Sequence, residues 1–575
     1  MDLIQTSLPA WLYSYAQWTH RNPDNCGLLN RYEVFSPCQT RRALFYTFTP
    51  YGCGDSTDLQ KILLDTLSEE SDLLKIAKSI NKQVWGSYIC WIEDKYTKQS
   101  IFFNDPLHSV RLYYRQQGKT LLIDPLMNKL LFPCIKWNRD FLASVAITQF
   151  GNLNETPFAD VNLLVPGHAL IININCDISQ KRIWPDQIFC QPAQQAVGSI
   201  ATSAIQVMSR IASLHQNIVV SLTGGIDCAA VALLQRSVTA QHRPIAGLHF
   251  YCPSSPELDE RLFTAAAAYA ANISLVRICL DNHPPFKVLS LSALPQIIST
   301  QFMYQSINDE ICMILEKTGG VFVDGHSGDQ IFSSTPSPAA LIDRFIKGNI
   351  CLSWQAAIDL ALLSTTGLPR ISYGNVHATY DLTLKKKKLA ESHLSKLELF
   401  TPEFIKLAFQ NSSSNKLQSS NLQKLEKDKV ITLEQMICSR PCFGDRAFPP
   451  ILSPLLTNPV IQATLSNPNY WYYDKYDDRI LLQHAAARHS LCKSLWRRTT
   501  NKFELSLVAG LMKNQRAIKQ LLHEGVLVQQ GILTRQGIDQ VFGSVALGDL
   551  NAAITLSLPI CVEMFCNKWE SAKLQ

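Results

Sequence analysis

Two short stretches of the chain combine glycines with an acidic residue in a way that suits the binding of an anion. The first, 221-SLTGGIDCAAVALL-234, follows the β-branched run 217–222 and continues with apolar residues spaced at i, i+3, i+4 and i+7. This pattern predicts a strand, a glycine turn and a helix. Glycines let a backbone approach a ligand closely, and the free N–H groups of a helix's first turn attract phosphate oxygens. The stretch therefore predicts an anion-binding turn.

The second stretch, 324-DGHSGDQIF-332, also follows an apolar run and places glycines beside an acidic residue, Asp329. We expect Asp227 and Asp329 to face one another across neighbouring strand ends, where two carboxylates can hold Mg²⁺ that bridges nucleotide phosphates. Either stretch alone could be a purely structural turn. Because the two stretches occur in this order and both at strand ends, together they indicate such a site more specifically than either does alone. The P-loop signature with its lysine is absent.

The elements around these stretches predict an α/β fold with two domains. From about residue 195, apolar runs of strand length alternate with segments of helical period: strands at 245–251, 275–280 and 321–325, and helices at 257–271 and 306–318. Such alternation predicts a parallel sheet with helices on both faces. Residues 1–190 instead contain short alternating runs broken by turn residues, which predict a β-rich domain. The expected domains are 1–190 and 195–575.

Composition limits the classes of protein to which the chain can belong. A net charge of +6 over 575 residues does not indicate nucleic-acid binding. The sequence predicts no membrane span, because it has no uninterrupted apolar run of spanning length, and no secretory signal, because Met1 is not followed by a basic segment. The apolar stretch 552–565 contains Pro559 and predicts a buried pair of helices. The 17 cysteines are scattered without metal-ligand spacing, so we expect a cytoplasmic protein with reduced thiols.

A basic and polar region lies between the expected elements of the second domain. Lys385 to Lys388 form a run of four lysines, and the polar segment 411–421 follows. These features predict an exposed insertion at 385–421. Its charge is either a solvated face or a contact for an acidic or peptidic partner.

These residues carry a resemblance to the asparagine-synthetase-like amidotransferases. The segment 223-TGGIDC-228 resembles their SGGxDS pyrophosphate loop, and 325-GHSGDQ-330 resembles their GxGxDE segment. Residues 448–486 resemble the helical part of that family, and 105–124 resembles the DPxGxxPLYY hairpin of its N-terminal domain. The resemblance covers nearly the whole chain and is weakest between about 350 and 430.

The resemblance implies the fold of each domain. The N-terminal domain would be a glutaminase-type, Ntn-like β-rich sandwich, and the C-terminal domain an adenine-nucleotide α-hydrolase-like parallel-sheet synthetase with helical additions. Glutamine-using members begin with a cysteine nucleophile once the methionine is removed, whereas Asp2 follows Met1 here and the first cysteine is Cys26. Glutamine hydrolysis is therefore not expected, the first domain is expected to be a degenerate scaffold, and nitrogen must come from another amine.

Members without that cysteine include β-lactam-type synthetases and lasso peptide cyclases, which close a macrolactam between a peptide's N-terminal amine and an Asp or Glu side chain. Residues 448–465 and the histidine in 325-GHSGD-329 resemble the cyclases most. The resemblance then implies a precursor peptide as substrate, with a leader-peptide protease and a leader-recognition protein as partners. Two alternatives stay open: an ammonia-dependent asparagine synthetase or β-lactam-type synthetase, and a catalytically silent scaffold that binds peptide or nucleotide.

The same resemblance assigns residues to ATP and Mg²⁺. A carboxylate is activated by attack on the α-phosphate of ATP, which releases pyrophosphate. Asp227 and Asp329 would position magnesium. The residues expected to cradle pyrophosphate are Thr223, the backbone of Gly224 and Gly225, and Cys228. Those expected to contact adenosine, largely through backbone groups, are Leu222, Leu248, Asp324 and Gly325.

The attacking amine needs a base, and the developing negative charge needs a cation. His326 occupies the position of the family's variable acid/base residue, although it could instead only orient the turn. Lys502 is the expected cation, with Arg497 and Arg498 as rivals, because the register of 493-KSLWRRTTNKF-503 is ambiguous.

Three further residues leave alternatives open. Cys228, at the start of a helix, could have a lowered pKa and act as a nucleophile, or could simply replace the family's serine. Arg479 could contact substrate or form a structural salt bridge. Gln330 replaces the family's glutamate, which removes one possible carboxylate from the metal site.

Overall fold

A computed structural model gives the fold of the chain. It describes residues 28–36, 40–48, 59–118, 120–127, 130, 136–175, 177–185, 193–254, 259–332, 354–355, 357–359, 361–362, 398–414, 430, 433–434, 436–438, 440–441, 448–467, 471–487 and 504–573.

The chain divides into two compact units. The first comprises Met1–Leu142, Phe150–Asp186 and Glu434–Arg446, and the second comprises Ala143–Gln149, Gln187–Leu433 and Ala447–Gln575. Residues 434–446 thus belong to the first unit, although they follow most of the second unit in the sequence. In the first unit, Arg182 forms an ion pair of 2.7 Å with the buried Glu434, which ties this late segment to strand β9 (Ile178–Arg182).

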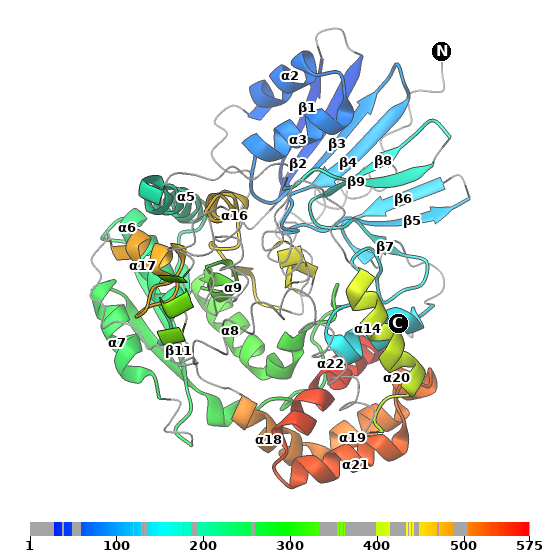
Figure 1. Ribbon diagram of the computed structural model, residues 1–575, viewed down its shortest axis with the longest axis vertical. Coiled ribbons are helices and arrows are strands. Elements are labelled where there is room, and N and C mark those ends of the chain that lie inside the picture. The colour runs from blue at the N-terminus through cyan, green and yellow to red at the C-terminus, as the bar shows by residue number, and fades with distance from the viewer. Residues whose placement is uncertain are drawn as a thin grey trace. The chain divides into compact units, whose positions relative to one another are not determined.

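An antiparallel sheet of six strands is the centre of the first unit. Its order is β1-β2-β3-β4-β8-β9. The strands are β1 (Leu28–Phe35), β2 (Arg41–Phe48), β3 (Tyr88–Asp94), β4 (Gln99–Asn104), β8 (His168–Ile172) and β9 (Ile178–Arg182). Helices α2 (Leu59–Glu69) and α3 (Leu73–Gln83) lie side by side over its strands (Figure 1).

Side chains of alternating direction give this sheet two buried faces. One face, with Phe45 and Phe103, packs against Leu63 of α2 and Ile76 and Ile80 of α3. The other face packs against apolar residues in and around a small sheet of order β6-β5-β7. Those three strands are β5 (Tyr113–Gln117), β6 (Thr120–Asp124) and β7 (Asn162–Leu163).

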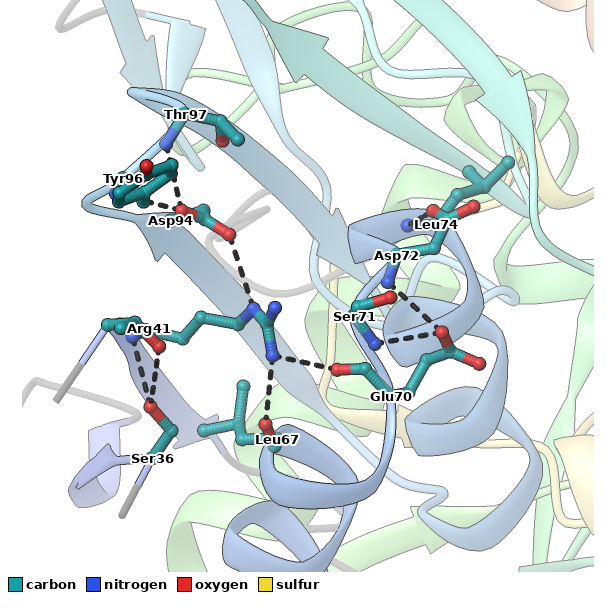
Figure 2. Close-up of polar contacts among 11 residues, drawn as sticks. Ser36, Arg41, Leu67, Glu70, Ser71, Asp72, Leu74, Asp94, Tyr96 and Thr97 are labelled. Carbon is teal, nitrogen blue, oxygen red and sulfur yellow. Dashed lines mark hydrogen bonds and ion pairs between the residues drawn. The ribbon is translucent and has the colours of Figure 1, made fainter. Parts of the chain in front are cut away.

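Arg41 fixes the link between α2 and α3 to the strands beneath it (Figure 2). Its guanidinium donates to the carbonyls of Leu67 and Glu70 and forms an ion pair of 3.2 Å with Asp94. Partial burial acts to raise the pKa of Asp94, but amide hydrogen bonds from Thr97 and Tyr96 and the Arg41 pair outweigh it and lower that pKa. Arg41 thus satisfies helix-end carbonyls that have no partner within the helix.

A parallel sheet of five strands, β12-β11-β10-β13-β14, is the centre of the second unit. Its strands are β10 (Ile218–Ser221), β11 (Ile245–Tyr251), β12 (Ser274–Cys279), β13 (Val321–Val323) and β14 (Ile451–Leu452). All four pairings are parallel. The predicted α/β class is therefore confirmed at a coarse level: one antiparallel region and one parallel sheet.

Helices cover the parallel sheet. Helix α8 (Gln305–Thr318) packs Ile307, Ile311 and Leu315 against Val219 and Leu248. Ile218 and Val220 of β10 alternate with Val219 and are buried too. Helix α6 (Ile226–Val238) packs on β10 and on α5 (Ala193–Leu214), and α5 also packs against α16 (Asn458–Leu465) and α17 (Ile480–Ala487).

The C-terminal part of the second unit is helical. Its helices are α14 (Pro402–Ser414), α18 (Glu504–Lys513), α19 (Gln515–Glu524), α20 (Val526–Gln529), α21 (Arg535–Ala546) and α22 (Leu550–Lys573). The expected helix pair at 552–565 is wrong, because α22 is one helix with Pro559 inside it. Part of α22, Leu550–Ala572, is long and apolar enough to cross a membrane, but 67% of its apolar stretch is buried inside the protein, as in core helices of soluble proteins.

Candidate functional site

The two glycine–aspartate turns lie at the carboxyl ends of adjacent strands. Strand β10 pairs with β13 on one side and with β11 on the other. The first turn leads directly into α6, whose N-cap is Gly225. The second leads into α9 (Gly328–Ile331). Ligands of open parallel sheets bind beyond this edge of the sheet, so the topology brings both predicted turns to the expected place.

Glycines allow the second turn to touch the first turn of α6. A Cβ atom at position 325 would lie 2.7 Å from the amide nitrogen of Cys228, and one at position 328 would collide with the Asp227 carboxyl group. Ser327, between these glycines, has a φ of 72° and is buried. This left-handed conformation is costly for a residue with a side chain and is found mostly where the surrounding structure requires it.

Asp227 and Arg479 form a buried ion pair at the start of α6. Arg479 Nη1 donates to Asp227 Oδ2 over 2.7 Å. The Arg479 side chain is 5% exposed and the Asp227 side chain 15% exposed. Burial raises the pKa of Asp227 to about 7, with the nearby Asp329 adding to the increase and Arg479 opposing it. Gly328, which precedes Asp329 in the sequence, lies directly against the Asp227 carboxyl group, so the chain brings Asp329 to the same part of the site.

Arg479 is held in a strained backbone conformation immediately before α17. Its φ is 51°, and its Nε also donates to Asp478 over 3.1 Å. Burial acts to lower its pKa, but Asp227 and Asp478 outweigh that and raise it, so the guanidinium is charged. Of the two alternatives for this residue, the structure contains the salt bridge, and the bridge lies inside the candidate site.

Glu260 is a residue of the site that the sequence analysis did not identify. It precedes α7 (Arg261–Ala270), and its Oε2 accepts the backbone N–H of Gly224 over 3.0 Å. A carboxylate thus occupies one of the donors that the glycine turn would offer to a phosphate. The only signal in the sequence was an acidic residue near the start of the helix that follows the next strand.

Leu222 and Leu248 are joined through their backbones. The N–H of Leu222 donates to the carbonyl of Leu248 over 2.8 Å, and the carbonyl of Leu222 lies 3.0 Å from His249 Nδ1. Thr264 of α7 is 3.2 Å from the same nitrogen. This network links the end of β10 to α7. The side chains of both leucines are fully buried, so a ligand contact at either residue would involve backbone atoms, as predicted for adenosine.

Asp324 fixes the second turn at its beginning. Its Oδ1 accepts the amide of His326 over 3.2 Å and also the hydroxyl of Ser453, and its own amide donates to the carbonyl of Leu452 over 2.9 Å. His326 is exposed on this turn. Its imidazole is thus accessible to a reacting group, which the predicted acid/base role requires. Gln330, next to Asp329, donates to that carboxylate over 3.1 Å through its side chain.

Cys228 lies in the first turn of α6, beside Thr223. Burial raises the pKa of its thiol, and contacts with Thr223 only partly oppose the increase. A raised pKa argues against the alternative in which Cys228 is a nucleophile. Thr223 Oγ1 instead accepts the amide of Gly225 over 3.3 Å, which shapes the turn.

The carboxylate oxygens of Asp227 and Asp329 suit a magnesium ion whose other coordination positions are filled by a bound ligand. In the part of the chain that the structure describes, no group of three or more His, Cys, Asp and Glu residues comes together at metal-binding positions. Asp227 Oδ1, however, is buried without a hydrogen-bond partner, and Asp329 is close. Mg²⁺ is commonly held by one or two carboxylates together with substrate phosphates, so two carboxylates fit this ion.

Several predicted residues lie outside the described residues. They are Lys502, Arg497, Arg498, Asp2, Cys26 and the lysine run 385–388, together with most of the predicted insertion. The cation of the site therefore stays a prediction.

Comparison with known proteins gives little further information. No protein-family model and no curated protein sequence matches this chain. Among solved structures, it has a likeness to the glutamine phosphoribosylpyrophosphate amidotransferase from B. subtilis complexed with ADP and GMP. That likeness has 12% identity and a TM-score of 0.14, and it covers 49% of this chain and 55% of that chain. A likeness with so low a TM-score does not show a shared fold.

Proposed function

We propose that the chain is an ATP-dependent synthetase that activates a carboxylate as an acyl-adenylate and joins it to an amine, releasing AMP and pyrophosphate. The observation that carries this proposal is the meeting of two glycine turns at adjacent strand ends, with the unpartnered Asp227 Oδ1 between them. An anion-binding helix start beside two carboxylates suits a metal-bound polyphosphate.

In this proposal the first turn holds the pyrophosphate part of ATP. Thr223, the amides of Gly224 and Gly225, and Cys228 would surround it, and Asp227 and Asp329 would hold Mg²⁺. The ion would neutralise charge that develops on the phosphate oxygens. Adenosine would lie against the backbone of Leu222, Leu248, Asp324 and Gly325.

The reaction takes two steps. A carboxylate oxygen of the substrate attacks the α-phosphorus, and pyrophosphate leaves. A neutral amine then attacks the acyl carbon, AMP leaves with that carboxylate oxygen, and His326 accepts the proton lost by the nitrogen. Lys502, Arg497 or Arg498 would stabilise the negative charge of the transition state.

Within this class we propose a lasso peptide cyclase, on the resemblance of residues 448–465 and 325–329. The substrate carboxylate is then an Asp or Glu side chain of a precursor peptide, and the amine is that peptide's N-terminus. A leader-peptide protease and a leader-recognition protein are the proposed partners. The other branches are an ammonia-dependent asparagine synthetase and a β-lactam-type synthetase.

The test is to incubate the protein with ATP and Mg²⁺, either with free aspartate and ammonia or with a candidate precursor, its protease and its recognition protein. AMP, pyrophosphate and product mass are measured. The proposal predicts pyrophosphate only with the precursor, and a core peptide lighter by one water. Pyrophosphate with free aspartate would instead support the asparagine synthetase. No pyrophosphate in either mixture would favour a silent scaffold.

A further inference from the structure

A cavity of about 660 Å³ lies within the second unit, apart from the glycine turns. Its wall includes Phe250 near the end of β11 and Leu280 just after β12. It therefore opens at the carboxyl edge of the parallel sheet, where ligands of such sheets bind. Because β11 pairs with β10, the cavity belongs to the same edge as the first glycine turn.

The lining of this cavity is mainly apolar. Besides Phe250 and Leu280, it includes Tyr304, Ile307 and Ile311 from the start of α8 and the segment before it. Charged residues that line it, Asp281 and Lys513, are exposed. An interior of aromatic and branched aliphatic groups favours an apolar ligand group, and the charged margin suits a polar chain that continues into solvent.

Helix α18 forms the remaining wall. Ser506, Ala509 and Lys513 line the cavity and follow one another at helical spacing. Gly510 places the helix directly against the backbone of Pro285, because a Cβ atom there would collide with the Pro285 carbonyl oxygen. The wall is therefore fixed by close packing, and the cavity is a defined feature of the second unit.

Two polar side chains of the lining have unsatisfied atoms. Gln301 Oε1 and His283 Nδ1 are buried without a hydrogen-bond partner. Buried polar atoms without partners cost free energy, which a ligand can recover by supplying the missing hydrogen bond. A peptide supplies both N–H and C=O groups beside an apolar side chain.

We infer that this cavity binds an apolar side chain, aromatic or branched aliphatic, of the peptide whose carboxylate is activated. Pockets of roughly 300–1,000 Å³ enclose ligands much larger than a free amino acid, and a free aspartate would bring no apolar group to the lining. The inference rests on the proposed synthetase function and deepens it by defining the substrate as a peptide with an apolar anchor.

The test uses N-acetyl-phenylalanine amide and N-acetyl-leucine amide as probes, with N-acetyl-asparagine amide as the polar control. Binding to the full chain is measured by calorimetry. The matched variants are Ala509→Trp, which places a large side chain at the cavity wall, and Ala546→Trp, at an exposed position of α21. Binding of ATP with Mg²⁺ is measured for each protein.

We expect both apolar amides to bind at least tenfold more tightly than the asparagine amide. Ala509→Trp should weaken that binding at least tenfold and leave ATP affinity unchanged, whereas Ala546→Trp should change neither. Equal binding of all three amides, or binding of the apolar amides that survives Ala509→Trp, would overturn this inference but not the proposed function. If Ala509→Trp weakens ATP binding as well, the cavity holds the adenine base and the inference is wrong. Absence of ATP binding in the unaltered protein would overturn the proposed function, and the inference with it.

Discussion

Arg479 Nη1 lies 2.7 Å from Asp227 Oδ2, although 252 positions separate the two residues in the sequence. The pair joins the residue before α17 to the first turn of α6. It leaves Asp227 Oδ1 without a partner, so one oxygen of the carboxylate is held by Arg479 and the other makes no hydrogen bond.

Replacing Arg479 alone should destabilise the protein more than replacing both Arg479 and Asp227. Arg479→Met leaves a buried carboxylate unpaired and should lower the free energy of unfolding by about 3–5 kcal/mol. The double variant Arg479→Met with Asp227→Leu removes both charges and should recover much of that loss. Urea denaturation of the single and double variants measures the difference. Equal stability of the unaltered protein and Arg479→Met would show that the pair contributes little.

Glu260 should weaken the binding of nucleotide. Its carboxylate accepts the amide of Gly224, so it occupies a phosphate donor and repels a phosphate. Glu260→Gln removes the charge and should tighten ATP binding several-fold, because a charged hydrogen bond is stronger than a neutral one by about 1 kcal/mol. Calorimetric titration with ATP and Mg²⁺ tests this. Weaker binding would mean that Glu260 instead holds the turn in its binding conformation.

Gly328 should not tolerate a methyl group. An added Cβ would collide with the carboxyl group of Asp227, so Gly328→Ala should displace that side chain and reduce ATP binding at least tenfold. Gly543→Ala in α21 is the matched control, because a Cβ there meets no heavy atom within 4 Å. The control should gain about 0.5–1 kcal/mol of stability, since alanine favours a helix over glycine. Unaltered ATP affinity in Gly328→Ala would contradict the close approach of the two turns.

Glu563 should make the stability of the helical part depend on pH. Its carboxyl group accepts the amides of Val526 and Leu527 at the start of α20, and burial raises its pKa to about 8. An exposed glutamate ionises near 4.5. Between these values the folded protein binds one proton more than the unfolded chain, so this group lowers the free energy of unfolding as pH rises from about 4.5 to 8.

Glu563→Gln removes the titrating group and should reduce this pH slope. The variant should also lose about 1–2 kcal/mol at pH 5, because the two backbone N–H groups meet different carboxyl oxygens, and the glutamine nitrogen, which only donates, would replace one of these oxygens. Urea denaturation at pH 5, 6.5 and 8 compares the two proteins. The same slope in both would show that Glu563 does not titrate in this range.

The sequence predicted those parts of the fold that depend on local pattern. The run 217–222 and the helical period after Ile226 fall on β10 and α6, since a strand, a glycine turn and an amphipathic helix each leave a signal within a few residues. The helix break expected at Pro559 was wrong. Residues on several sides of α22 are buried, and burial of that area outweighs the roughly 3 kcal/mol that proline costs inside a helix.

Contacts between distant elements leave no comparable signal in the sequence. Glu260 reaches Gly224 because β10 and β11 pair in parallel and α7 begins beside the turn. Arg479 reaches Asp227 through the packing of α17 on α6. Neither position has a spacing that would indicate its partner. The late segment 434–446 likewise joins the first unit through tertiary contacts such as the Arg182–Glu434 pair.

The most direct test of carboxylate activation follows one oxygen atom. The precursor peptide is labelled with ¹⁸O in its Asp or Glu side-chain carboxylate and incubated with ATP, Mg²⁺, the protease and the recognition protein, and the nucleotide products are analysed by mass spectrometry. Asp227→Asn is the inactive comparison, and Asp539→Asn, at an exposed ion pair, is the matched active control. The account predicts one ¹⁸O atom in AMP from the unaltered protein and the control, and no AMP from Asp227→Asn. Unlabelled AMP, label in inorganic phosphate with ADP, or full turnover by Asp227→Asn would contradict it.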